Sequence, residues 1–190
     1  MILLTRHAKS AHNRDNIFAG IKINSELVDE GRENTSKLAT KIFSKYNFDV
    51  IICSTLLRTY QTAQIYQKLH EKKYRKSILI VKTPLLNEVN VGVISGLSPT
   101  QVKLEYPMEY NNIQSKFFKD WTFTQGDTPE LLFQRYLALR EFISNFHQKN
   151  ILLVGHAMFN KVILYNWLDL TDINFGHDLF IELSEISRKK

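Results

Sequence analysis

The chain has 190 residues, of which 44% are hydrophobic and 23% are charged. This composition is typical of a globular protein and excludes disordered, collagen-like and fibrous classes. The single cysteine, Cys53, excludes an internal disulfide and a metal site built from several cysteines. The net charge of +6 suits anionic partners such as phosphates, nucleic acid or a membrane surface, and does not choose among them.

Hydropathy argues against a membrane protein. The longest apolar runs are short, such as residues 50–53, whereas a bilayer span needs about 20 residues. The N-terminus has no basic start, and its apolar run is too short for a secretory signal. We therefore expect a cytoplasmic protein without a membrane partner.

Short apolar runs alternate along the chain with longer segments of helical periodicity. Strands are predicted over residues 2–5, 49–53, 77–81, 150–154 and 178–183, the last as an edge strand. Helices are predicted over residues 27–46, 54–70 with Ser54 as N-cap, 101–121 in pieces, 128–146 and 155–167. The alternation predicts an α/β sandwich around a mainly parallel sheet.

The segment 87–127 stands out from this alternation. Residues 87–99 contain Gly92, Gly96 and Pro99, which predicts a loop. Residues 101–121 are rich in aromatic side chains, which could form a lid over a substrate or an amphipathic helix packed on the core, and we favour the helix. Because long loops inside a compact domain are usually functional, we expect residues 87–127 to be an insertion that covers a site, within one domain spanning 1–190.

Polar residues follow four of the predicted strands, where ligands bind in open α/β sheets. These strand exits supply two arginines, two histidines and one carboxylate, with hydroxyl and amide groups beside them: Arg6, His7, Ser10 and Asn13; Ser54 and Arg58; Glu88; and His156. Each residue alone would more often be structural or solvated. Their joint placement after four strands predicts one site.

The chemistry of this set suits phosphoryl transfer. Two arginines can bind a phosphate with paired hydrogen bonds. An unprotonated imidazole is a competent nucleophile toward phosphorus, and a carboxyl group can protonate the leaving oxygen and then activate water. A second histidine, if protonated, adds a donor to the phosphate. The sequence has no P-loop, dinucleotide fingerprint, zinc-binding HExxH or GxSxG motif.

Five segments, in order, resemble motifs of the histidine phosphatase superfamily, in its phosphoglycerate mutase-like branch. They are residues 5–13 (TRHAKSAHN), similar to its RHG signature; 54–63 (STLLRTYQTA), similar to SxLxRAxQTA; 86–96, similar to its LxE loop with two glycines; 126–128 (GDT), where GES is usual; and 154–157 (VGHA). One motif alone would be weak support, but the ordered set covers most of the chain.

The resemblance implies a three-layer α/β/α sandwich with a mainly parallel central sheet. It implies that His7 is the phosphorylated nucleophile and that Glu88 is the proton donor and later the base. It also implies that four residues bind the phosphoryl group: Arg6, Asn13, Arg58 and His156. No metal and no organic cofactor are expected. The remaining histidines match no ligand spacing and are interpreted as structural or surface residues: His12, His70, His147 and His177.

Four positions depart from the family pattern. Ala8 replaces the glycine after the nucleophile, and Lys9 replaces the usual acid, so that it either adds positive charge near the site or points to solvent. Thr59 replaces the alanine after Arg58, and Asp127 replaces the glutamate of GES. None of these changes removes a reacting group, so we expect an active enzyme.

The clamps that family mutases place around a small phosphoacid are missing. Val91 precedes Gly92 where a tyrosine is common, residues 97–99 hold no lysine after Gly96, and no pair of adjacent arginines occurs. A mutase must also keep water away from its phosphoenzyme. We therefore predict a phosphatase that hydrolyses a small phosphorylated metabolite through a phosphohistidine intermediate. The alternatives are a phosphoglycerate mutase-type transferase and a phosphohistidine protein phosphatase.

Two alternatives are not enzymes. The first is a module that uses the same pocket only to bind an anion, and the complete set of reacting groups argues against it. The second is a nucleic-acid binder, which would need clustered cations and stacking aromatics. The only such cluster, residues 72–76, falls at a helix-to-strand turn and is expected to be solvated. No nucleic-acid partner is therefore expected.

Overall fold

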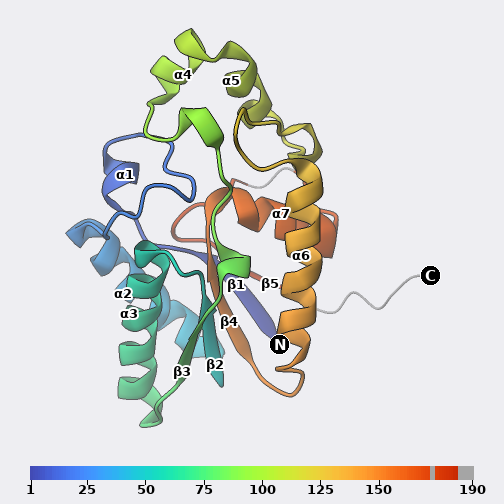
Figure 1. The fold of residues 1–190 in the computed structure, drawn as a ribbon. Coiled ribbons are helices and arrows are strands. Elements are labelled where there is room, and N and C mark those ends of the chain that lie inside the picture. The colour runs from blue at the N-terminus through green and yellow to red at the C-terminus, as the bar shows by residue number, and fades with distance from the viewer. Residues whose placement is uncertain (172–173, 184–190) are drawn as a thin grey trace.

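The computed structural model describes residues 1–171 and 174–183, and it shows a central sheet between two layers of helices (Figure 1). The five strands are β1 (Ile2–Arg6), β2 (Val50–Cys53), β3 (Leu79–Lys82), β4 (Ile151–Gly155) and β5 (Phe180–Glu182). Their order across the sheet is β3-β2-β4-β1-β5. The first four are parallel, and β5 pairs antiparallel with β1 at one edge. The predicted edge strand and the mainly parallel sheet are confirmed.

Helices cover both faces of the sheet. They are α1 (Ala11–Arg14), α2 (Asp29–Lys45), α3 (Leu57–Tyr74), α4 (Pro99–Glu105), α5 (Pro107–Gln114), α6 (Pro129–Ser144) and α7 (Ala157–Leu168). Figure 1 shows α2 and α3 on one side of the sheet, α6 and α7 on the other, and α4 with α5 gathered at one end. The three-layer α/β/α sandwich is therefore confirmed.

The central strands explain why the apolar runs are continuous. Ile51 and Leu152 pack into the core beneath α2 and α3, whereas Ile52 and Leu153 pack into the core beneath α6 and α7. Successive side chains of a strand point to opposite faces, so a strand covered on both faces needs apolar residues at every position. This burial holds the strand exits in fixed relative positions.

The predicted helix starts had different outcomes. The Thr128 side chain accepts a hydrogen bond from the Leu131 N–H at 3.3 Å, which confirms it as the N-cap of α6. The prediction for Ser54 is wrong, because α3 begins at Leu57, and the Ser54 hydroxyl points into the site instead. The helix also extends beyond residue 70, to Tyr74.

The segment 87–127 is helical in pieces, as predicted, and it packs into the core. Phe118 and Trp121 are buried in the cluster beneath α6 and α7, which favours packing over an exposed aromatic lid. The loop at Gly92 has a φ of +60°, and a side chain there would meet the Thr124 carbonyl oxygen at 1.9 Å. Glycine is therefore required at this close approach. Among the described residues, no helix combines the length and apolarity needed to cross a membrane.

Candidate active site

His7 follows β1 and is 1% exposed. Its backbone N–H donates to the Gly155 carbonyl at 2.9 Å, which extends the pairing of β1 with β4. Its Nδ1 lies 2.7 Å from the Ala8 carbonyl oxygen. A carbonyl only accepts, so Nδ1 carries the proton and Nε2 keeps its lone pair. Burial, followed by the charge of Arg58, holds the pKa of His7 well below 6.5. The ring is therefore neutral, and its Nε2 has the free lone pair that a nucleophile needs.

His156 follows β4, and its ring lies 5.1 Å from the ring of His7. Arg58 donates from Nε to the Nδ1 of His156 at 3.2 Å, so Nδ1 is unprotonated and the proton sits on Nε2. Burial, then the charges of Arg58 and Arg6, lowers the pKa of His156 well below 6.5. The ring of His156 is therefore neutral in the structure, because burial and the two neighbouring arginines disfavour a further positive charge.

A chain of hydroxyl groups supports His156. Its Nε2 proton points to the Ser54 Oγ at 2.7 Å. The Thr59 hydroxyl donates to the Leu56 carbonyl at 2.7 Å, which leaves the Ser54 hydroxyl to donate to the Thr59 Oγ1 at 2.6 Å. Both hydroxyl side chains are fully buried. Thr59, where the family usually has alanine, therefore fixes Ser54 as an acceptor for His156.

The two arginines are held by carbonyl groups and not by carboxylates. Arg58 follows β2 on α3 and donates to the Ile23 and Gly20 carbonyls at 2.8 and 2.9 Å. Burial lowers the pKa of Arg58 to about 10, so it stays charged at neutral pH. Arg6 donates from Nη1 to the Phe175 carbonyl at 3.1 Å, and its Nε is buried without a partner among the described residues. An unpaired buried donor is costly, and a bound anion would satisfy it.

Glu88 lies in the loop after β3, and its carboxylate meets the N-terminus of α7. One oxygen, Oε1, accepts from the Val89 and Phe159 N–H groups, both at 3.0 Å. The other oxygen, Oε2, accepts only from the Met158 N–H, at 3.3 Å. A carboxylate oxygen has two lone pairs, so Oε2 has room for a proton while Oε1 does not. The helix terminus thus orients the carboxyl group for proton transfer at Oε2.

Asp127 fixes the loop that carries Glu88. Its Oδ2 accepts from the Asn90 N–H at 2.9 Å, and its own N–H donates to the Asn90 carbonyl at 2.8 Å. Arg135 pairs with the same Oδ2 at 3.5 Å and lies 4.1 Å above the ring of Phe159. The shorter acidic side chain, which departs from the family pattern, therefore binds the backbone two residues after Glu88.

Asn13 is oriented by its neighbours. Its Oδ1 accepts from the Ser10 N–H at 3.1 Å and from the Ser10 hydroxyl at 2.9 Å. Its Nδ2 donates to the Nε2 of His12 at 3.1 Å. The His12 ring lies 5.7 Å from the His7 ring, and burial lowers its pKa to about 3, so it remains a neutral acceptor. One Nδ2 hydrogen of Asn13 is left to bind a ligand.

Two site residues escape the sequence analysis. The sequence predicts that His12 and His177 are structural or surface residues, whereas in the structure both rings border His7. His177 donates from Nδ1 to the His7 carbonyl at 2.6 Å, and its ring lies 5.4 Å from the His7 ring. Burial lowers its pKa to about 4. The position of His12 beside Asn13 could have indicated its role, whereas His177, near the other end of the chain, offered no such signal.

The other two histidines match their interpretation. His70 is buried on α3 and its Nε2 lies 2.8 Å from the Asn47 Oδ1, which is a structural contact. His147 is exposed. Within residues 1–171 and 174–183, no group of three or more His, Cys, Asp or Glu side chains is arranged to bind a metal ion. Cys53 is buried, and burial raises the pKa of its thiol to about 12, so it is not a nucleophile here.

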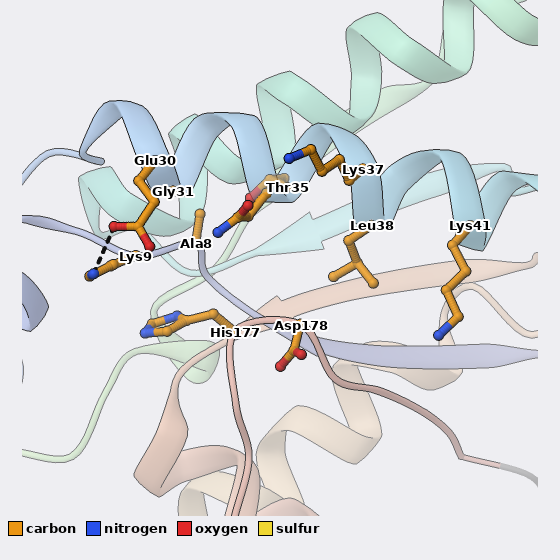
Figure 2. A pocket seen from close by; sticks show the side chains of 11 residues that line it. Ala8, Lys9, Glu30, Gly31, Thr35, Lys37, Leu38, Lys41, His177 and Asp178 are labelled. Carbon is orange, nitrogen blue, oxygen red and sulfur yellow. Dashed lines mark hydrogen bonds and ion pairs between the residues drawn. The ribbon is translucent and has the colours of Figure 1, made fainter.

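The predicted side chains converge on a cavity of about 220 Å³. It is lined by five of the six predicted site residues, Arg6, His7, Asn13, Arg58 and Glu88, while His156 lies behind them against His7 and Arg58. A larger hollow of about 560 Å³ lies between α2 and the loop before β5 (Figure 2). Figure 2 shows Lys9 on its wall, paired with Glu30 at 2.8 Å. Lys9 therefore points away from the 220 Å³ cavity.

Comparisons with known proteins agree with this geometry. The family model of the histidine phosphatase superfamily (branch 1) matches residues 2–188. The chain is 32% identical over 106 residues to a 2,3-bisphosphoglycerate-dependent phosphoglycerate mutase of Bartonella henselae, an alignment that covers 55% of this chain and 50% of that protein. It is 25% identical over 158 residues to phosphoserine phosphatase 1 of Hydrogenobacter thermophilus, covering 83% and 71% of the two chains.

A solved structure shows the same fold. The alpha-ribazole phosphatase from Shigella flexneri superposes with a TM-score of 0.72 at 22% identity, covering 89% of this chain and 80% of that one. The chain spans about half the length of the Bartonella mutase and more of the other two proteins. The two sequence relatives are a mutase and a phosphatase, so the choice of reaction depends on the site.

Proposed function

Because the chain belongs to the histidine phosphatase superfamily, we propose that it is a phosphomonoester hydrolase that acts on a small phosphorylated metabolite through a phosphohistidine at His7. One observation carries this proposal. The Nε2 of His7 is unprotonated in a buried cavity that it shares with two charged arginines. A neutral nucleophile beside fixed cations suits attack on a phosphate dianion.

In the proposed first step, the Nε2 of His7 attacks phosphorus and the bond to the leaving oxygen breaks. Arg6, Arg58 and the amide of Asn13 bind the phosphoryl oxygens. The proton on the Oε2 of Glu88 moves to the leaving oxygen, which departs as an alcohol. Proton donation is needed most where the alcohol is a poor leaving group.

In the second step, Glu88 acts as the base. Its carboxylate takes a proton from a water molecule, the water oxygen bonds to phosphorus, and the bond from phosphorus to His7 breaks. Inorganic phosphate leaves and the Nε2 of His7 regains its lone pair. Neither of these two reaction steps requires a metal ion or an organic cofactor. A chelator is therefore expected to have no effect on turnover.

The surroundings of Gly92 support a phosphatase over a mutase. Val91, at the position where family mutases commonly have tyrosine, is 1% exposed and packs into the core. Residues 97–99 supply no cation to hold a second acidic group. Water is also expected to reach the phosphoenzyme, since there is no clamp to retain the first product.

We assign the segment 87–127 as the cover of this site, within a single domain over residues 1–190. The loop that lines the cavity pairs with it: the Phe18 N–H donates to the Leu97 carbonyl at 2.9 Å and the Gly96 N–H to the Phe18 carbonyl at 2.7 Å. The Ser95 hydroxyl adds a bond to the Ala19 carbonyl at 3.0 Å. The lone buried thiol of Cys53 fits a cytoplasmic protein, and nucleic acid is not among its proposed partners.

Hydrolysis of p-nitrophenyl phosphate tests the proposal. The chain should release p-nitrophenol in the presence of a chelator and should be inhibited by vanadate. His7→Ala should lower turnover by at least about 10⁴-fold, because it removes the nucleophile. Wild-type turnover in that variant would disprove the assignment of His7. Phosphate binding without any turnover would support a simple anion-binding module instead.

A second variant tests the proton donor. Glu88→Gln should lower kcat/KM for an alkyl phosphate by about 10²–10³-fold and for p-nitrophenyl phosphate much less, because kcat/KM reports the first step, in which p-nitrophenolate leaves without a proton. Equal losses on the two esters would argue against Glu88 as the acid. Efficient phosphoryl exchange between 3-phosphoglycerate and its bisphosphate would show that the enzyme is a mutase.

A further inference from the structure

The cavity that contains His7 is lined by both charged and apolar side chains. Arg6, Arg58 and Glu88 are the lining residues that carry charge among the described residues. Four apolar side chains also line the cavity, and together they are called the apolar wall: Ile17, Phe18, Val91 and Met158. Because the arginines would hold the phosphoryl group of a bound phosphomonoester, the apolar wall is the surface left for its leaving group.

The cations around the site are already engaged. The Nη1 and Nη2 groups of Arg58 are held by backbone carbonyls, so the guanidinium cannot turn toward a distant group. Lys22, beside the cavity loop, donates to the Gly92 carbonyl at 3.2 Å. Lys9 faces the other hollow and pairs with Glu30. His12 is neutral, since burial holds its pKa near 3. None of these groups is positioned to meet a second anion on the leaving group.

The apolar wall is anchored to the core, since Val91 belongs to it and Phe18 and Met158 pack against it. Val91 is buried, and a side chain added at Gly20 would meet the Val91 Cγ2 at 2.9 Å and the Val89 carbonyl oxygen at 2.8 Å. The backbone of Phe18 is held on both sides by the 96–97 loop. Ile17, Phe18 and Met158 are half-buried and contribute the surface that an incoming ligand can cover.

We propose that this site selects phosphomonoesters whose leaving group is uncharged and largely apolar, and that it discriminates against esters carrying a carboxylate or a second phosphate on that group. The proposal rests on the proposed phosphatase function. Burying an anion against apolar side chains without a partner is strongly unfavourable, whereas an alkyl or aryl group gains from the contact.

Two esters of equal shape test the selection. In 3-methylbutyl phosphate and 3-(phosphonooxy)propanoate, an isopropyl terminus replaces a carboxylate, and both leaving groups are primary alcohols. The first should have a kcat/KM at least about tenfold higher, because only the second must place an anion at the apolar wall. An equal or reversed ratio would overturn the substrate proposal and leave the phosphatase intact. If neither ester nor p-nitrophenyl phosphate is hydrolysed, the proposed function itself fails.

A charge added to the wall should change the ratio. Ile17→Arg places a cation on the apolar wall, and it should shift the ratio toward the carboxylate ester by about tenfold. Ile17→Met changes the length and keeps the side chain apolar, and Leu79→Arg adds the same charge on β3, where the side chain is 65% exposed. Both controls should leave the ratio unchanged.

Two outcomes would contradict the proposal that the apolar wall selects the leaving group. A shift in Leu79→Arg as large as in Ile17→Arg would show that overall charge, and not the wall, sets the preference. An unchanged ratio in a folded Ile17→Arg variant would show that the leaving group does not contact this surface. If Ile17→Arg fails to fold, Met158→Arg on the first turn of α7 makes the same test from a second residue of the apolar wall.

Discussion

The exits of β1 and β4 place two histidines side by side, and the two have opposite hydrogen-bonding states. Both rings are buried, and burial is the largest cause that lowers each pKa. His7 donates from Nδ1 to a carbonyl and leaves Nε2 bare, whereas His156 accepts at Nδ1 from Arg58 and keeps its proton on Nε2. Residue type and burial therefore do not decide the role of a histidine. The partner of one ring nitrogen decides what the other can do.

The largest expected effect separates these two roles. His156→Ala should lower turnover of p-nitrophenyl phosphate by about 10²–10³-fold, because it removes a group beside the phosphoryl site but leaves the nucleophile. His7→Ala should abolish turnover. The variants should also differ in a covalent label: mass spectrometry after an alkaline quench should find phosphohistidine in His156→Ala and none in His7→Ala. Phosphohistidine in His7→Ala would show that His156, and not His7, is the nucleophile.

The second prediction tests whether burial among cations keeps the site histidines neutral. His177 has a pKa of about 4 in the folded protein, against about 6.5 in an unfolded chain. Between these values the unfolded state binds a proton that the folded state excludes. The stabilisation by the neutral ring is therefore complete above pH 6.5 and is lost as the pH falls toward 4.

The measurement is the free energy of unfolding in urea at pH 7.5 and pH 5. Wild type should lose about 2 kcal/mol more than His177→Gln between these values, since glutamine does not titrate and can still donate to the His7 carbonyl. Titration of carboxylates changes both proteins alike and cancels in the difference. Equal losses in the two proteins would mean that His177 is protonated in the fold at pH 5.

The parts of the site that could be predicted are those that depend on strand ends. The apolar runs that form the strands are followed, at once or after a few residues, by Arg6, Arg58 and Glu88. Parallel strands all end at the same edge of their sheet. Their convergence therefore follows from topology. The tautomers do not, because they depend on single contacts such as the Arg58 Nε with the His156 Nδ1. His177 reaches His7 through tertiary contact alone.

The helix boundaries show the same limit. Ser54 has the side chain of a good N-cap, and local preference alone places it at the start of α3. In the structure its hydroxyl accepts from His156, 102 positions away, and the helix starts three residues later. A long-range hydrogen bond in a buried site thus overrides a capping preference of about 1 kcal/mol.

Asp127 offers a third test, which concerns the loop that carries Glu88. Asp127→Ala removes the acceptor for the Asn90 N–H and the partner of Arg135, so the carboxyl of Glu88 should be less well oriented. We expect about a tenfold loss of kcat on alkyl phosphates and a smaller loss on p-nitrophenyl phosphate. Asp127→Glu, with the residue usual in the family, should restore activity in part.

A matched control for that test lies in the same segment. Asp120 is exposed, accepts from the Ser115 hydroxyl at 2.6 Å and does not line the cavity that contains Glu88. Asp120→Ala should leave the ratio of alkyl to aryl turnover unchanged. If Asp127→Ala slows both esters equally, Asp127 stabilises the fold and does not position the acid.

The smallest expected effect concerns Thr59, which distinguishes the environment of His156 from that of His7. If His156 gains a proton at Nδ1 when a phosphate dianion binds, it can donate to that anion, and the ring is positively charged as long as Nε2 keeps its proton on an acceptor. The Thr59 hydroxyl makes Ser54 that acceptor, because it takes the Ser54 proton. Thr59→Val keeps the shape and removes this function, so the positively charged form of His156 in the complex should be less stable. We expect about a fivefold loss of kcat above neutral pH and an alkaline limb shifted to lower pH.

Thr59→Ser retains the hydroxyl and should behave as wild type, and Thr59→Ala, the residue usual in the family, should resemble Thr59→Val. His7 accepts no bond from this chain of hydroxyls, so the acid limb of the pH profile should be the same in all four proteins. If the pH profiles of Thr59→Val and wild type superimpose, His156 acts as a neutral group. The hydrogen-bond partner of its Nε2 then has no effect on donation from its Nδ1. A change in the acid limb would instead show that Thr59 affects His7 as well as His156. The nucleophile would then respond to a chain of hydroxyl groups that, in the structure, reaches only His156.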